Sequence, residues 1–426
     1  MSQPAERAAS LPRDTSPSWI ERVLRGRLLA RLAAGIHQGR LIIHDPCGTT
    51  VLGRPAAANR DLTVNVRIKD LAFYTHIAIH GSVGAGEAYG EGLWECDDLV
   101  GLIRLLIRNR DLLDGMETGL ASLAGAALRI WHALRGNTRA GSRRNIAAHY
   151  DLGNEFFSTF LSRDLMYSAA LWSAEDETLE QASMRKLEAI CGKLELRAGQ
   201  RVVEIGTGWG GFAIHAASRH GCHVTTTTIS KAQYALATQR VAAAGLTDRV
   251  TVLLRDYRDL EGRYDRLVSI EMIEAVGARY LPAYFAKVGS LLAPEGRALI
   301  QAITIEDHRY EQALREVDFI KRHIFPGGFI PSISAMLDAK TRASDLGLVH
   351  LEDFGHSYAR TLRAWRAAFM TRLPEVRAQG CDERFIRLWE FYFAYCEGGF
   401  LERSIGVAQL LFARPGARCS GPRWTV

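Results

Sequence analysis

The chain has 426 residues, which corresponds to two or three domains of ordinary size. Apolar residues make up 47% and charged residues 23%, so a disordered, collagen-like or coiled-coil chain is excluded. Seven cysteines without a CxxC pair argue against a disulfide framework or zinc knuckle and fit a reducing cytoplasm. The net charge is +6, and residues 1–145 hold 19 basic against 14 acidic side chains. This excess favours an anionic partner, either lipid headgroups or nucleic acid.

The N-terminal third predicts a small α+β unit. Residues 19–36 have apolar side chains at helical spacing with arginines interleaved, which is typical of a helix that lies on a membrane or docks on its own domain. Predicted strands follow at 41–43, 62–66 and 72–74, and predicted helices at 99–109 and 114–135. We expect an accessory domain over 1–135 and a polar, basic linker over 136–144. No signal peptide and no apolar run of the ~20 residues that a membrane span needs are visible.

From residue 145 the pattern becomes an alternation of strands and helices. Helices predicted at 145–162 and 176–194 come first. Strands are then predicted at 202–205, 223–228, 250–254, 265–270 and 297–304, with helices at 211–220 and 231–245. Such an alternation predicts an α/β fold with a doubly wound, mainly parallel sheet over 145–426.

A glycine-rich turn joins the first of these strands to its helix. Gly206, Gly208 and Gly211 satisfy GxGxxG, a pattern that lets the backbone approach a nucleotide cofactor. A dinucleotide site needs an acidic residue about 20 positions on, and none occurs between Glu204 and Asp248. Glu204 itself directly precedes the glycines and can meet a cationic or hydroxyl group. These features favour S-adenosylmethionine over NAD.

Several blocks, in order, resemble the cyclopropane-fatty-acyl-phospholipid synthase family of S-adenosylmethionine-dependent methyltransferases. The blocks lie at 149–157, 166–172, 204–211, 228–233, 264–277, 325–328 and 392–400. Residues 38–112 are similar to the accessory domain of the longer members. The resemblance implies a Rossmann-like class I methyltransferase fold. The residues expected to bind cofactor are Tyr167, Ser168, Glu204, Gly206, Gly208, Thr228, Ile229, Gln233, Asp256, Tyr257 and Arg258.

The implied reaction adds a carbon to the double bond of an unsaturated acyl chain. The alkene attacks the sulfonium methyl and leaves a cation, so the site must exclude water, stabilise charge and remove a proton. Aromatic faces suit the cation. The candidates are Tyr150, Tyr167, Trp209, Tyr358, Phe391 and Tyr392. The residues expected to be catalytic are Glu274, Tyr392, Gln301, Tyr150 and Tyr167.

In many members of the family a bound bicarbonate is the base. The residues at its ligand positions here are Glu274, Gln301, Ile303, Tyr392 and Ala169, of which Ala169 and Ile303 would use backbone groups. Gln301 stands where the family has His, and Ala275 where a further His is usual. Glutamine cannot carry charge or relay a proton. Either bicarbonate is held weakly or Glu274 accepts the proton, and the product is a cyclopropane or a methyl- or methylene-branched chain. Glu271 is expected to be a catalytic-strand or solvated acid.

The resemblance implies an unsaturated acyl lipid as substrate, with phospholipid expected. It also implies a cytoplasmic homodimer that is peripheral to the anionic inner membrane. A methyltransferase for a soluble amine and a degenerate, non-catalytic lipid-binding member are the alternatives. No nucleic-acid motif and no His/Asp/Glu cluster with metal spacing is visible, so neither nucleic acid nor metal is expected.

Overall fold

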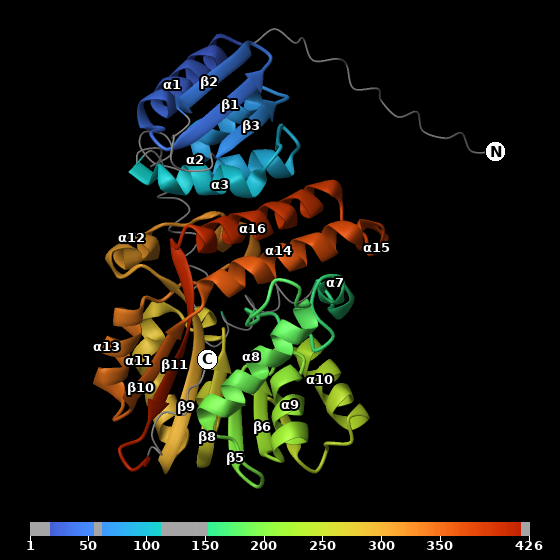
Figure 1. Cartoon of the computed structure of the whole chain (residues 1–426), viewed down its shortest axis with the longest axis vertical. Coiled ribbons are helices and arrows are strands. Elements are labelled where there is room, and N and C mark those ends of the chain that lie inside the picture. Colours follow the sequence, from blue (N-terminus) through green and yellow to red (C-terminus); the bar gives the residue numbers. More distant parts are fainter. Residues whose placement is uncertain (1–17, 55–61, 112–137, 139–140, 142–151, 419–426) are drawn as a thin grey trace, which may run out of the picture.

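A computed structural model describes residues 18–54, 62–111, 138, 141 and 152–418. Two β-sheets organise it, with a four-stranded sheet at one end of the long axis and a seven-stranded sheet at the other (Figure 1). The predicted helix at 114–135, nearly all of the predicted linker at 136–144, and Tyr150 lie outside the described residues. Among the described helices, none combines the length and the apolar character needed to cross a bilayer.

The N-terminal sheet has the order β2-β1-β3-β4, and three helices accompany it. The elements are α1 (Trp19–Gly35), β1 (Gly39–Asp45), β2 (Gly48–Arg54), β3 (Thr63–Ile68), α2 (Ala72–Gly90), β4 (Trp94–Cys96) and α3 (Leu99–Arg108). Helix α1 begins at Ser18, whose hydroxyl accepts from the Glu21 amide while the Glu21 carboxylate accepts from the Ser18 amide. The predictions for 19–36, 41–43, 62–66 and 99–109 are confirmed.

The strand predicted at 72–74 is wrong, because these residues form the first turn of α2. Phe73, Tyr74 and Ile77 are all buried, a spacing that puts them on one helical face rather than on alternating faces of a strand. The strand prediction considered only residues 72–74, and the helical spacing becomes visible only when Ile77 is included. Strands β2 and β4 were not predicted.

The C-terminal sheet has the order β10-β11-β9-β8-β5-β6-β7. Its strands are β5 (Arg201–Ile205), β6 (His223–Thr228), β7 (Val250–Leu254), β8 (Tyr264–Ile270), β9 (Leu292–Ile305), β10 (Gly347–Asp353) and β11 (Ile405–Ala413). Strands β5 to β9 pair in parallel, whereas β11 is antiparallel to both β9 and β10. The predicted mainly parallel α/β sheet is confirmed, and only the antiparallel edge was missed. The strand order reverses at β5, between β6 and β8, which is where such folds hold ligands.

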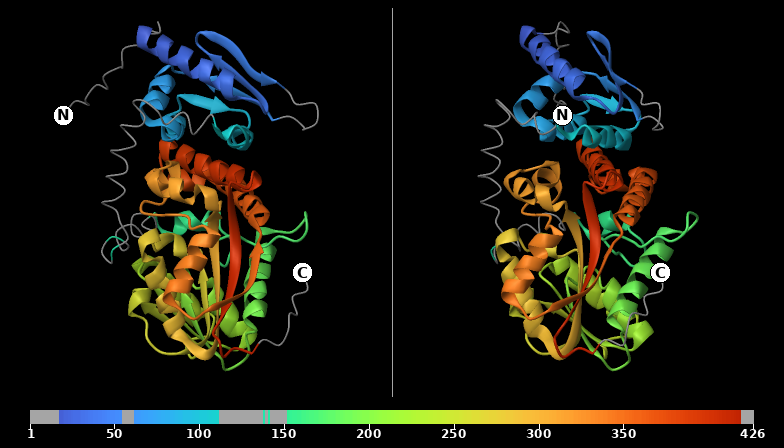
Figure 2. Two further views of the ribbon diagram at one scale, coloured as in Figure 1. Left: turned by 90° about the vertical axis from the view of Figure 1, so that its left-hand side faces the viewer. Right: turned by 60° about the vertical axis from the view of Figure 1, so that its left-hand side comes forward.

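Helices cover both faces of this sheet, with α8, α9 and α10 on one side and α11 and α13 on the other (Figures 1 and 2). The helices are α7 (Asn154–Ser158), α8 (Leu179–Leu194), α9 (Gly211–His220), α10 (Lys231–Ala243), α11 (Leu281–Leu291), α12 (Tyr310–Arg315), α13 (Ile333–Ala343), α14 (Gly355–Thr371), α15 (Leu373–Ala378) and α16 (Glu383–Leu401). The helices predicted at 176–194, 211–220 and 231–245 are confirmed.

Helix α16 joins the two sheets, since it packs against α14 on one side and against α2 and α3 on the other (Figure 1). A single cluster of buried apolar side chains runs from β1 and β3 through α16 to α14. At its rim, Glu402 accepts from Arg104 at 2.7 Å and from Arg108 at 2.9 Å. The two sheets are therefore linked by a shared apolar core as well as by ion pairs.

Candidate active site

A cavity of about 580 Å³ opens at the carboxyl ends of β5, β6 and β8. All eleven residues predicted to bind cofactor line it. They reach it from the ends of three neighbouring parallel strands and from the segment before α8, so residues far apart in sequence meet at one edge of the sheet. This edge is the topological switch point that the predicted α/β fold requires.

The glycine loop between β5 and α9 adopts backbone conformations that favour glycine. Gly206 has φ +100° and its amide donates to the Thr227 carbonyl at 3.1 Å. A Cβ at Gly211 would lie 2.7 Å from the Met166 sulfur and 2.8 Å from the Asp164 carbonyl oxygen. The loop therefore packs directly on the segment that carries Tyr167 and Ser168, which explains why this pattern needs glycine at its last position.

Polar side chains on the wall opposite the glycine loop are held in place by hydrogen bonds within the protein. Thr228 donates to the Gln233 side-chain oxygen at 2.8 Å, which fixes the amide and leaves its NH2 group as a donor. Asp256 accepts twice from the Arg258 guanidinium, at 2.9 and 2.6 Å. A nucleoside needs hydroxyl and ring-nitrogen partners of this kind, and Tyr257 adds an aromatic face. Together with the glycine loop, the donor set fits S-adenosylmethionine.

Two buried ionisable side chains lie near the glycine loop, and only one of them was identified from the sequence. Glu204 was predicted; it is 2% exposed, accepts from Thr226 at 2.6 Å, and burial raises its pKa to about 8. Lys186 was missed because it reads as one cationic residue on a helix. Its ammonium is fully buried and donates to the Ser168 hydroxyl at 2.9 Å, and burial lowers its pKa to about 8. Lys186 thus positions Ser168, and it is close enough to Glu204 for the two side chains to interact electrostatically.

Glu271 lies in the cavity with both carboxylate oxygens hydrogen-bonded. Its Oε1 accepts from the Ala169 amide at 2.9 Å and from the Gln301 side chain at 2.8 Å, and its Oε2 accepts from the Tyr358 hydroxyl at 2.8 Å. Its backbone has φ +47°, in the left-handed region that only a few per cent of non-glycine residues adopt. Its interpretation as a solvated acid at the end of the strand does not hold, because its carboxylate is enclosed by these three donors.

Glu274 lies one 3-10 turn further on, in Ile273–Ala275. Its Oε1 accepts from the Ile303 amide at 2.6 Å, while its Oε2 is buried and has no hydrogen-bond partner among the described residues. Burial, reinforced by the negative charge of Glu271, raises the pKa of Glu274 to about 8. Glu274 is therefore mostly protonated at pH 7, and burial raises the pKa of the neighbouring Glu271 as well, an effect that its three donors oppose.

The positions expected to hold bicarbonate are engaged by the protein itself. The Ala169 amide and Gln301 both donate to Glu271, and the Ile303 amide donates to Glu274. The orientation of the Gln301 amide is also fixed by Gln409, which donates to its side-chain oxygen at 2.9 Å. The groups that would bind an anion thus already bind a carboxylate of the chain, so this site does not fit bicarbonate.

The aromatic candidates lie at different places. The hydroxyls of Tyr167 and Tyr392 are 3.1 Å apart, and both rings line the cavity, as do those of Tyr358 and Trp209. Phe391 also lines it, but its ring packs between Phe319, at 4.7 Å between centroids, and the aromatic residues of the N-terminal unit. Tyr167, Tyr358 and Tyr392 therefore surround the acid pair, whereas Phe391 belongs to the wall that faces the N-terminal sheet.

Beyond the acid pair the same cavity continues into the N-terminal unit. Its wall there is apolar and comes from α1, β1, β3 and α3. Representative residues are Leu32, Leu41, Val66, Ile68, Leu102 and Ile103. The whole space is thus polar where the glycine loop lies and apolar at its other end. This continuity could not be predicted from the sequence, because it depends on how α16 packs between the two units.

Comparisons with known proteins agree with this geometry. The family model "Mycolic acid cyclopropane synthetase" matches residues 137–410. The chain is 38% identical to Tuberculostearic acid methyltransferase UfaA1 of Mycobacterium tuberculosis, covering 92% of this chain and 91% of that protein. It is 37% identical to cyclopropane-fatty-acyl-phospholipid synthase of Escherichia coli, covering 84% and 90%. The solved structure of cyclopropane synthase CmaA1 with SAH and CTAB has TM-score 0.60 and 29% identity, and the match covers 64% of this chain and 98% of that one.

Proposed function

The chain belongs to the mycolic acid cyclopropane synthetase family and is an S-adenosylmethionine-dependent methyltransferase, and we propose that it transfers a carbon to the double bond of an unsaturated acyl chain in membrane phospholipid. The observation that carries the proposal is the single cavity that joins the cofactor wall to an apolar compartment, with an acid pair at the junction. An acyl chain fits the apolar end, and its double bond would then meet the acids.

Within this proposal the cofactor is held by the residues predicted for it. Tyr167 and Ser168 would lie along its methionine part, and the backbone of the glycine loop would face it. Thr228, Ile229 and Gln233 would hold the ribose side, with Asp256, Tyr257 and Arg258 at the adenine. When bound, S-adenosylmethionine supplies an electrophilic methyl on a sulfonium. The chain's own contribution is to orient the alkene, exclude water and take up the proton.

We further propose that Glu271 is the base, in place of bicarbonate or Glu274. Its carboxylate is the group that the Ala169 amide and Gln301 hold, and these are two of the positions from which the family binds its anion. Glu274, with a pKa of about 8, keeps its proton at neutral pH, whereas the three donors to Glu271 oppose the rise in pKa that burial causes there and favour its ionised form. The uptake of the proton by Glu271 converts it to the acid and leaves the acyl product neutral. Tyr167, Tyr358 and Tyr392 present ring faces to the transient cation.

The proposed product is a methyl- or methylene-branched chain. Burial raises the pKa of the Glu271 carboxyl, but the three hydrogen bonds to its oxygens must rearrange before it can take up a proton, which slows proton removal. Slower proton loss gives a hydride time to shift to the adjacent carbon, and loss of a methyl proton then gives a methylene group rather than a ring. The name of the relative UfaA1 describes methyl transfer, which supports this choice.

Binding to the membrane would use α1. Trp19, Ile20 and Val23 are 73%, 49% and 43% exposed at its start, Arg22 lies among them, and the exposed Arg27 follows one turn later. Further along, Leu28 and Leu32 of the same helix line the apolar end of the cavity. A helix that touches the bilayer with one end and the cavity with the other offers a route for the acyl chain. The accessory-domain boundary, the homodimer and the location at the inner membrane stay predictions.

A soluble amine is the alternative substrate. Coclaurine N-methyltransferase shares the fold, but at 21% identity this likeness carries nothing more. An amine substrate would leave the apolar end of the cavity without a role, so the acyl chain is favoured.

The test is mass spectrometry of lipids after the protein has acted on mono-unsaturated phospholipid vesicles with S-adenosylmethionine. We expect acyl chains heavier by one CH2 that still yield ozonolysis fragments of a methylene group. A heavier chain that resists ozonolysis would replace the branched product by a cyclopropane. If the mass does not change although the cofactor binds, and a soluble amine is methylated instead, the lipid proposal is wrong.

A further inference from the structure

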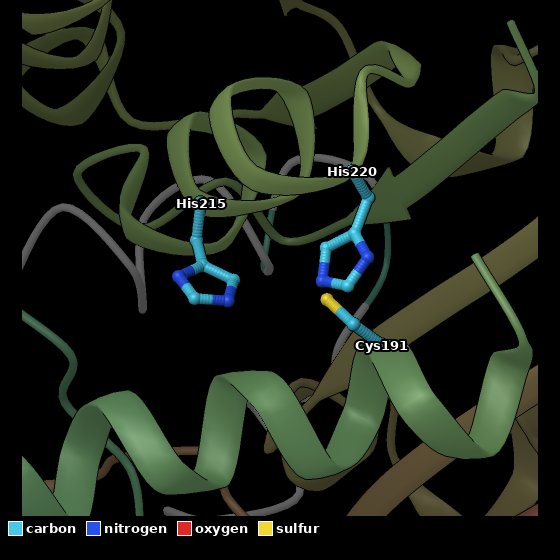
Figure 3. A group of neighbouring side chains, drawn as sticks. All are labelled: Cys191, His215 and His220. Carbon is cyan, nitrogen blue, oxygen red and sulfur yellow. The ribbon is translucent and has the colours of Figure 1, made fainter. Parts of the chain in front are cut away.

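A cluster of metal-ligating side chains lies outside the active-site cavity, between α8 and α9 (Figure 3). Helix α8 contributes Cys191, and α9 contributes His215 and His220. Figure 3 shows the two rings and the sulfur turned toward one another across the gap between the helices. None of the three lines the cavity. Their sequence positions gave no metal pattern, because the spacing only becomes short when the two helices pack together.

The geometry is close to that of a metal site. The Cys191 sulfur and one nitrogen from each histidine all lie within 4.8 Å of one another. In a tetrahedral zinc site the ligand atoms stand about 2.0–2.3 Å from the metal, and thus roughly 3.3–3.8 Å from each other. The distances between the ligand atoms would have to shorten by up to ~1 Å for a metal to bind.

A fourth ligand lies beside the cluster, although its carboxylate is not among the groups that all lie within 4.8 Å of one another. Glu188 lies one turn before Cys191 on α8, and its Oε2 is 3.0 Å from His215 Nε2 and 3.3 Å from His220 Nε2. Its side chain is 58% exposed, so the cluster is open to solvent on that side. On the inner side Cys191 is fully buried and His215 is 6% exposed. A cation could therefore enter from solvent and meet one sulfur, two nitrogens and one oxygen.

We propose that Cys191, His215, His220 and Glu188 form a structural zinc site that links α8 to the C-terminal end of α9. This donor set is of the kind that zinc accepts. Binding would replace the thiol proton of Cys191 by the metal, with release of the proton to solvent. Without metal, the same groups form a carboxylate that two imidazoles share, beside a buried thiol.

A metal that links α8 to α9 would affect the cofactor site, because both helices carry parts of its wall. Helix α9 begins at Gly211, the last glycine of the cofactor loop, and α8 carries Lys186, which positions Ser168. A metal between the helices would hold these two walls of the cofactor site in a fixed relation. It takes no part in the reaction, because it lies outside the cavity.

The test uses Co²⁺ as a spectroscopic substitute for zinc in the full-length protein after treatment with a chelator. We expect a thiolate-to-cobalt charge-transfer band and the intense visible bands of tetrahedral cobalt, at about one metal per chain. Cys191→Ala should abolish the charge-transfer band, and His220→Gln should weaken metal affinity at least ~10-fold. Cys222→Ala is the matched control, since this buried cysteine neighbours the cluster without belonging to it, and it should keep the band.

Thermal unfolding with and without Zn²⁺ gives an independent readout. The wild-type chain and Cys222→Ala should unfold at a higher temperature with zinc, whereas His220→Gln, at a partly exposed position, should fold but show a smaller shift. The proposal is overturned if the wild-type chain binds no metal. It is also overturned if the band survives Cys191→Ala or disappears in Cys222→Ala.

Discussion

At the scale of single residues, Glu271 combines two unusual properties. Its backbone is left-handed, which costs about 1 kcal/mol or more for a side chain with a Cβ. Its carboxylate nevertheless finds three donors, from Ala169, Gln301 and Tyr358. Strain that the surroundings hold in place is typical of functional residues. This is the physical reason for assigning the proton acceptor to Glu271.

Replacement of Glu271 by glutamine tests that role directly. Glu271→Gln keeps the size and hydrogen-bonding capacity but cannot take a proton, so turnover should fall ~10²–10⁴-fold. Calorimetry should show nearly unchanged cofactor binding, whereas Gln233→Ala should weaken it. If Glu271→Gln turned over at the wild-type rate, another group would be the base.

Glu271→Gly separates the two base systems. Glycine suits φ +47°, and its small size would free the Ala169 amide and Gln301 for an external anion. We expect this variant to be inactive in bicarbonate-free buffer and to recover with added bicarbonate, while the wild-type rate does not respond. A second substitution, Gln301→His, should increase the recovery. A wild-type enzyme that needs bicarbonate would contradict the assignment.

The raised pKa of Glu274 predicts how the free energy of unfolding depends on pH. Its pKa is about 8 in the folded chain and near 4.5 when unfolded, so the folded state binds more protons between these values. The free energy of unfolding should therefore decrease as pH rises from about 4.5 to 8. Glu274→Gln removes this penalty and should be more stable than wild type at pH 9 by up to about 5 kcal/mol, since each pKa unit is worth about 1.4 kcal/mol, but similar at pH 5. Urea unfolding at both pH values measures the difference, and an equal gain at both would exclude titration as its cause.

At the scale of elements, local signals predicted the parallel strands and the glycine loop well. A run of β-branched residues followed by glycines needs no distant partner to be recognised. The prediction of a strand at 72–74 was wrong, because a run of only three residues fits both the period of a strand and that of a helix. The partners of Glu271 could not be predicted, since Ala169 and Tyr358 are brought to it from other elements. The cluster of Cys191 with two histidines was missed for the same reason.

The apolar end of the cavity predicts an effect on chain length. Val66 on β3 lines it and is buried, so Val66→Phe should fill part of the space. We expect turnover of long acyl chains to fall several-fold more than that of short ones, with cofactor binding unchanged. Val51→Phe, on the exposed side of β2, is the control and should leave this ratio alone. An equal loss for all chain lengths would mean that the N-terminal compartment does not hold the acyl chain.

In the molecule as a whole, the apolar end of the cavity and the exposed start of α1 lie in the N-terminal unit, whereas the acid pair lies in the C-terminal one. Trp19→Ser with Ile20→Ser should reduce binding to anionic vesicles about 10-fold or more, because each buried large side chain contributes ~1.5–3 kcal/mol. Cosedimentation measures this, and added salt should weaken the binding that remains. Val349→Ser, an equally exposed position on β10, should have no effect. Unchanged binding of the α1 variant would place the membrane contact elsewhere.

The left-handed backbone at Glu271 also has a genetic consequence. Glycine and glutamate codons can differ by a single base, and glycine is the residue that this conformation favours. One point mutation would therefore exchange a catalyst that carries its own base for one that borrows an ion from the cell. An enzyme with the built-in carboxylate would work at a rate that does not follow the supply of dissolved inorganic carbon.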